Sequence, residues 1–301
     1  MTGTGRILLI APLYLRKTPA FERAAALARA TDCALHIVAF DYLEGLATAL
    51  FVDSAAMEHA RQGYLDRHRE WLEEQARPMR ARGTQVTTEV IWCQNTVEEA
   101  VAHAREMAAT VVIKDVQHES FLKRTLFTPQ DIHLLHECAE PVHFVSTASH
   151  STPRKIVVGV DLYHQPMRTP GLNEALIKQA FKLGEQCNAE VHLLYAFDLT
   201  PINAADEGLG RAGYFYASNL TQELYEQQEA AFNALAERYN TPPENRHLIM
   251  GNPGSVLTTF ARQYDMDLIM LARVQRTGFA QWLGGTAEQV LYKAPSSVWL
   301  I

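Results

Sequence analysis

The chain repeats itself, and this internal repeat constrains its fold more than any other feature. Residues 6–14, RILLIAPLY, resemble residues 155–163, KIVVGVDLY. Residues 36–41, HIVAFD, resemble residues 192–198, HLLYAFD, with one additional residue in the second copy. Three further pairs of segments follow in the same order: 91–97 with 249–255, 111–114 with 268–271, and 141–145 with 295–301. The 301 residues therefore divide into two copies of one unit of about 150 residues, an ordinary domain size.

Short aliphatic segments alternate with amphipathic ones within each copy. In the first copy, strands are expected at 7–11, 35–40, 86–92, 111–113 and 142–145, because near-continuous aliphatic runs are typical of strands buried on both faces. Helices are expected at 20–30, 55–82 and 96–108, with a capping box from Thr96, and from Thr128, with Pro129 at the first helical position. The alternation predicts two α/β domains, 1–146 and 154–301, each a doubly wound, five-stranded parallel sheet with helices on both faces.

Charge, cysteine content and hydropathy exclude several classes of protein. Lys and Arg number 27 against 34 Asp and Glu, a net charge of −7, which disfavours nucleic acid and anionic membranes as partners. The four cysteines are widely spaced and form no CxxC pair, which argues against a disulfide framework. No signal peptide and no apolar run long enough to cross a membrane is visible. We therefore expect a cytoplasmic protein.

Glycine and polar residues follow the predicted strands of the second copy. Asp161, Gly251 and Gly254 come directly after strands, and the segment 272–288 leads from a strand into a helix. In doubly wound folds ligands bind beyond the carboxyl ends of the strands. Backbone N–H groups at a helix start favour phosphate, and Arg276 and Thr286 offer a guanidinium and a hydroxyl.

The whole chain resembles the tandem-type universal stress protein family, close to its E subgroup. The resemblance rests on 157–161 (VVGVD), 251–253 (GNP), 276–278 (RTG) and 284–290 (GGTAEQV). It implies two flavodoxin-like domains packed through their last strands as an internal pseudo-dimer, and a cytoplasmic stress-response role. Two such chains could still pair as a homodimer. Many members bind ATP through a G-x2-G-x9-G-(S/T) motif.

This sequence departs from the ATP motif. Ala272 and Gln275 stand where its first two glycines are expected, and Pro12 replaces Asp161 in the first copy. We predict a degenerate ATP or AMP site in the second domain and none in the first. Asp161 would contact the adenosine and the loop residues would hold the phosphates. The predicted binding residues are Asp161, Gly251, Gly254, Arg276, Gly278, Gly284, Gly285 and Thr286.

Three other features carry alternatives, and a fourth carries a single expectation. Apolar loops at 43–52 and 199–213 beside aromatic helices, including Tyr64 and Trp71, suggest a carrier of a lipid-like ligand in an inter-domain groove; ordinary packing is the other interpretation. Lys114 with 123–124 suggests an anion site, against solvated or snorkelling lysines. His133 and His136 share a helix face and suggest zinc, against helix packing.

The last of these features is a pair of acidic residues beside a strand. Asp265 and Asp267 flank its start and are expected to be solvated. No nucleophile elbow or P-loop is present, so we predict no catalytic residues and at most slow ATP hydrolysis.

Overall fold

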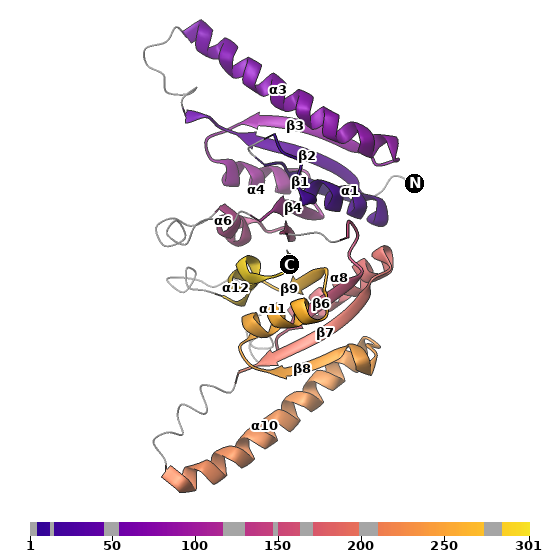
Figure 1. The fold of residues 1–301 in the computed structure, drawn as a ribbon, viewed down its shortest axis with the longest axis vertical. Coiled ribbons are helices and arrows are strands. Elements are labelled where there is room, and N and C mark those ends of the chain that lie inside the picture. Colours follow the sequence, from indigo (N-terminus) through magenta and orange to yellow (C-terminus); the bar gives the residue numbers. More distant parts are fainter. Residues whose placement is uncertain are drawn as a thin grey trace. The chain divides into compact units, whose positions relative to one another are not determined.

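The chain forms two α/β units in the computed structural model, Met1–Thr152 and Pro153–Ile301 (Figure 1). The structure describes residues 5–12, 15–44, 54–116, 130–146, 150–162, 171–198, 210–273 and 285–301. Each unit contains a buried sheet of short aliphatic strands, and the apolar faces of its helices pack against that sheet.

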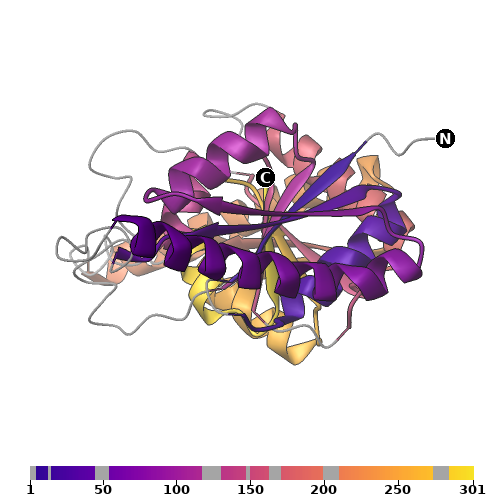
Figure 2. The same cartoon turned by 90° about the horizontal axis from the view of Figure 1, so that it is seen from above.

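The first unit contains five parallel strands in the order β3-β2-β1-β4-β5. Figure 2 shows helix α3 (violet) on one face of this sheet and helix α4 on the other. The strands are β1 (Arg6–Ile10), β2 (Ala34–Asp41), β3 (Val86–Trp92), β4 (Val111–Asp115) and β5 (Val142–Val145). The helices are α1 (Pro19–Thr31), α3 (Ser54–Ala81), α4 (Thr96–Glu106) and α6 (Gln130–Glu137).

The second unit repeats this arrangement, with the parallel strand order β10-β9-β6-β7-β8. Its strands are β6 (Lys155–Val160), β7 (Glu190–Phe197), β8 (Arg246–Met250), β9 (Leu268–Leu271) and β10 (Ser297–Leu300). Its helices are α8 (Leu172–Cys187), α10 (Gly210–Arg238), α11 (Pro253–Gln263) and α12 (Thr286–Lys293), with a 3₁₀ turn η1 (Pro243–Asn245) before β8.

The predicted fold class is confirmed: two tandem α/β units, each with a five-stranded parallel sheet. The strands were predictable because a strand buried on both faces must be apolar at successive positions. Among the described residues, no helix combines the length and the apolar character that crossing a bilayer requires.

Helices α1, α3 and α4 begin within one residue of their predicted starts, but the cap of α4 differs from the prediction. The capping box predicted from Thr96 is wrong: Asn95 is the N-cap, without a side-chain capping bond. Its Nδ2 instead donates to Glu98 Oε2 at 2.8 Å. The carboxylate is therefore engaged by a side chain and not by the backbone N–H that a capping box requires. Thr128 and Pro129 lie outside the described residues.

Candidate functional site

The topological switch point of the second unit, where its strand order reverses, lies between β6 and β9. Strands β6 and β7 extend the sheet in one direction, and β9 and β10 in the other. In open α/β sheets ligands bind beyond the carboxyl ends of the strands at this switch point. Asp161 follows β6 directly, and Ala272 and Arg273 follow β9. Asp161 and Ala272 therefore lie at the edge of the sheet where this class of fold binds ligands.

Asn173 holds the backbone of Asp161. Its Nδ2 donates to the Asp161 carbonyl at 2.8 Å, and its Oδ1 accepts from the Asp161 N–H at 3.2 Å. Asn173 lies in the first turn of α8 and is only 7% exposed. The pair of bonds satisfies both backbone groups where the chain leaves the sheet, which fixes the direction of Asp161. Sequence reasoning missed Asn173, because an amide twelve residues away carries no motif.

Tyr195 on β7 supplies a second polar group near Asp161. Its hydroxyl donates to Gln228 Oε1 on α10 at 2.9 Å. Burial, and to a smaller extent the negative charge of Asp161, raises the pKa of Tyr195 to about 12. The hydroxyl therefore stays protonated at neutral pH.

Gly251 and Asn252 shape the turn after β8. The φ angle of Gly251 is +145°, a backbone conformation that favours glycine, and its N–H donates to the Phe197 carbonyl at 2.9 Å. Asn252 then caps α11, where its Oδ1 accepts from the Ser255 N–H at 3.1 Å. The glycine at 251 is thus required by the turn itself.

The remaining predicted glycines differ in their surroundings. A Cβ at Gly254 would lie 2.5 Å from Gln289 Oε1, so its missing side chain lets α11 approach α12. Gly285 is the N-cap of α12, directly before Thr286, and a Cβ there would meet no atom of the described residues within 4 Å. Arg276, Gly278 and Gly284 lie outside the described residues.

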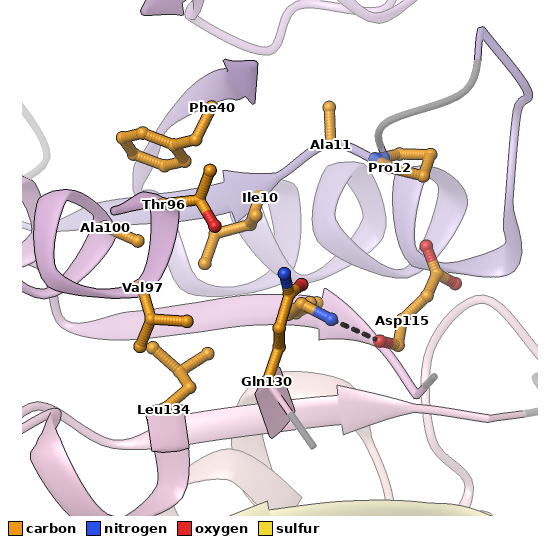
Figure 3. Close-up of a pocket in the computed structure, with 11 residues that line it drawn as sticks. Ile10, Ala11, Pro12, Phe40, Thr96, Val97, Ala100, Asp115, Gln130 and Leu134 are labelled. Carbon is orange, nitrogen blue, oxygen red and sulfur yellow. Dashed lines mark hydrogen bonds between the residues drawn. The ribbon is translucent and has the colours of Figure 1, made fainter. Parts of the chain in front are cut away.

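The crevice of the first unit is narrow and apolar. Figure 3 shows its lining, from the ends of β1, β2 and β4 and from α4 and α6, including Ile10, Pro12, Phe40, Val97 and Leu134. Its volume is about 80 Å³, whereas sites for drug-sized ligands are typically about 300–1,000 Å³. Pro12 contributes neither a charge nor an N–H where the second unit has Asp161.

The polar groups at this crevice bond to one another. Lys114 Nζ forms an ion pair with Asp131 Oδ1 at 2.6 Å, and Asp131 is fully buried. The Thr18 hydroxyl donates to the Asp115 carboxylate. Burial raises the pKa of Asp115, while the bond from Thr18 opposes this shift.

Two comparisons identify the relatives of this chain. The universal stress protein family matches it twice, over residues 15–146 and 152–301. Universal stress protein E of Escherichia coli strain K12 is 30% identical over 254 residues, which cover 84% of this chain and 78% of that protein. The chain is a universal stress protein. Its two matched regions make it a tandem member, of the E type.

Solved structures agree with this assignment at the level of the fold. A functionally unknown protein from Pseudomonas aeruginosa PAO1 superposes with a TM-score of 0.72 at 22% identity, covering 98% of this chain and 92% of that one. A universal stress protein from Archaeoglobus fulgidus superposes with a TM-score of 0.69 at 14% identity, covering 98% and 95%. Both likenesses extend over the whole tandem.

The structure gives little support to the alternative anion and zinc sites of this universal stress protein. The Lys114 side chain is only 12% exposed and its ammonium group forms an ion pair with Asp131, so it is neither snorkelling nor solvated. Residues 123–124 lie outside the described part of the chain. The side chain of His133 is 39% exposed, and its Nδ1 lies 3.6 Å from Glu137 Oε1. Among the described residues, the cluster with metal-binding geometry is a different one and does not include His133 or His136.

The aromatic side chains of α3 in this universal stress protein pack against its own sheet and helices. Trp71 meets Phe21 edge-on, with ring centroids 5.6 Å apart, and Tyr64 meets Trp92 edge-on at 6.0 Å. His68 on the same helix lies 2.5 Å from Asp41 at the end of β2, and both side chains are buried. For these described residues, ordinary packing accounts for the aromatic stripe. The apolar loops beside them lie mostly outside the described residues.

One of the two acidic residues expected to be solvated is not. Asp265 is exposed, as predicted, but Asp267 is 9% exposed. Its Oδ2 accepts from the backbone N–H groups of Arg154 and Lys155, at 2.9 and 3.1 Å. The carboxylate thus joins the start of β6 to the start of β9. The sequence separation of more than one hundred residues hides this role from any local pattern.

Proposed function

We propose that this universal stress protein is a stress-response ligand-binding module whose second domain, residues 154–301, holds an adenine nucleotide. The observation that carries the proposal is the fixed backbone of Asp161, which Asn173 holds at the carboxyl end of β6. A fixed backbone limits the positions that the Asp161 carboxylate can take, which lowers the entropy cost when that carboxylate accepts hydrogen bonds from a ribose or a base. In this proposal it contacts the adenosine.

The start of α12 would receive the phosphates. Gly285 is the N-cap of α12 and has no side chain that would cover the backbone N–H groups of the helix start, and the helix dipole favours negative charge there. Thr286 adds a hydroxyl, and Gly251 shapes the neighbouring turn. Gly254 is assigned to the packing of α11 on α12 and contributes to the site only through that packing. The residues Arg276, Gly278 and Gly284 complete the proposed site by the family resemblance.

The two domains differ in this proposal. The narrow crevice of the first domain, its Pro12, and the pairing of Lys114 with Asp131 all disfavour a polyanionic ligand there. We therefore assign one nucleotide to each chain, in the second domain. We place the protein in the cytoplasm, as a binding and regulatory module and not a dedicated enzyme.

Calorimetric titration of the full chain with ATP or AMP, with and without Mg²⁺, tests the proposal. Asp161→Asn keeps the side-chain shape but removes the charge, and a tenfold or larger loss of affinity is expected, since a charged hydrogen bond contributes about 1.5–3 kcal/mol. Asp265→Asn is the matched control: it makes the same charge change on an exposed loop before β9, at the opposite end of the sheet. Equal affinities of the two variants would contradict the assignment of Asp161.

Two further measurements separate the alternatives. Native mass spectrometry of the purified chain reports every co-purified ligand at once, and an acyl ligand without nucleotide would favour the lipid-like carrier. Slow ATP turnover that disappears in Arg276→Ala would make the protein an ATPase. Turnover that persists unchanged in that variant would point to a contaminant.

A further inference from the structure

A second polar cluster lies in the first unit, on the face of the sheet that α4 covers. His36 on β2 pairs with Thr87 on β3, and Val38 pairs with Glu89. Side chains two residues apart on a strand point to the same face. The side chains of His36 and Glu89 therefore lie side by side on one face of the sheet.

Helix α4 adds a second imidazole to this cluster. The rings of His103 and His36 stack with centroids 5.2 Å apart and planes at 17°. Both Nε2 atoms face one carboxylate oxygen, Glu89 Oε2, at 3.3 Å from His36 and 3.8 Å from His103. Three separate elements thus bring two nitrogens and one oxygen together.

These distances are close to those within a zinc site. Ligand atoms about 2.0–2.1 Å from a tetrahedral Zn²⁺ lie about 3.3 Å from one another. The candidate ligand atoms of His36, Glu89 and His103 all lie within 4.8 Å of one another. Two imidazoles and a carboxylate form a known zinc ligand set that leaves one position for water. The histidine side chains are 16% and 18% exposed and Glu89 is 46% exposed, so the cluster is supported by the protein and open on one side.

A hydrogen bond between Thr87 and the second ring nitrogen of His36 sets the orientation of that imidazole. Its Nδ1 lies 2.7 Å from Thr87 Oγ1. When Nδ1–H donates to this hydroxyl, the lone pair of Nε2 points toward Glu89. Metal-binding histidines usually have such an outer partner, which fixes the tautomer and the ring.

The second unit provides a natural comparison, because it has an aromatic residue in place of the ligand that α4 supplies in the first unit. In the second unit His192 and His247 occupy the strand positions of His36 and Glu89, in the same register. Phe260, the eighth residue of α11, stands where α4 has His103. The two imidazoles bond directly to each other, with His192 Nδ1 3.0 Å from His247 Nε2. The first unit therefore has two imidazole nitrogens and a carboxylate at these positions. The second unit has a hydrogen-bonded histidine pair, and the ring of Phe260 packs against both imidazoles.

We propose that His36, Glu89 and His103 bind one Zn²⁺ in the first unit, with Thr87 as the positioning residue of His36. The ion would tie α4 to the neighbouring strands β2 and β3. This site is independent of the nucleotide proposed for the second domain, because its ligands come from the other unit.

Titration of the chelator-treated full chain with Zn²⁺ alone, followed by calorimetry and by metal analysis after dialysis, tests this proposal. The wild type is expected to retain one tightly bound ion per chain. Glu89→Gln, which keeps the side-chain shape, and His103→Phe, which copies the second unit, should each lose it, with at least a 100-fold drop in affinity. Thr87→Val should keep the ion but bind it about 10- to 100-fold more weakly.

His133→Ala is the matched control, because it removes an exposed histidine from α6 and should leave binding unchanged. Circular dichroism checks that each variant is folded; if His103→Phe does not fold, the isosteric Glu89→Gln decides. A visible Co²⁺ spectrum with nitrogen ligation in the wild type, absent from Glu89→Gln, would support the same assignment. Absence of a tight ion in the wild type, or equal affinity in wild type and Glu89→Gln, would overturn it. ATP affinity should be the same in all these variants.

Discussion

Asn173→Ala should both destabilise the second unit and weaken its ligand site. The substitution removes two hydrogen bonds to the Asp161 backbone, at 2.8 and 3.2 Å, from a side chain that is only 7% exposed. Each bond contributes about 0.5–1.5 kcal/mol net, and a buried backbone group left without its partner costs about 1–3 kcal/mol. We expect a total loss of about 2–4 kcal/mol in the free energy of unfolding.

Urea denaturation followed by circular dichroism measures this loss, and hydrogen exchange with mass spectrometry localises it. A loss of 2 kcal/mol corresponds to about 30-fold faster exchange, which should appear in peptides that contain the end of β6. Asn173→Asp separates packing from bonding, because a carboxylate still accepts from the Asp161 N–H but cannot donate to the carbonyl. It should lose stability while preserving the side-chain volume.

Asn233→Ala is the control for Asn173→Ala, since it makes the same chemical change at a half-buried position of α10 and should shift stability by less than about 0.5 kcal/mol. Equal losses in the two alanine variants would refute the argument. So would unchanged exchange at the end of β6 in Asn173→Ala, because the bonds would then not hold that backbone.

Three further predictions concern the second unit. Burial, and to a smaller extent the charge of His192, lowers the pKa of His247 to about 4. As pH falls from about 6.5 to 4, His247 is therefore protonated in the unfolded chain but not in the folded chain. The free energy of unfolding should fall by about 1–2 kcal/mol over this range, after allowance for the half-buried ring. The melting temperature of His247→Phe should therefore depend less on pH across that range than the melting temperature of the wild type. Asp267→Asn weakens the charged acceptor of two backbone N–H groups at the start of β6 and should cost about 1–3 kcal/mol by urea titration. Gly159→Ala would place a Cβ 2.5 Å from a buried Leu271 methyl, and should cost about 1–3 kcal/mol, whereas Gly63→Ala, with open space around it, should not destabilise.

The strands were predictable because their burial on both faces leaves a local signature. Strands β3 and β5 begin and end where the aliphatic runs predicted. Helix caps leave a weaker local signature: Asn95, and not Thr96, is the N-cap of α4, and its side chain bonds to Glu98 and to no backbone N–H of the helix start. Asp161 and Gly251 directly follow β6 and β8, at the carboxyl ends of the parallel strands, where ligands bind in this class of fold.

What the sequence alone determined about this protein is its duplication, its α/β class and its family, since these depend on periodicity and short motifs. The tertiary structure decided which polar groups meet. Asn173 with Asp161, Lys114 with Asp131, and the start of β6 with Asp267 are pairings between different elements. His36, Glu89 and His103 are likewise far apart along the chain and converge only when β2, β3 and α4 pack. Such contacts depend on strand register and helix placement, which no local pattern of residues records.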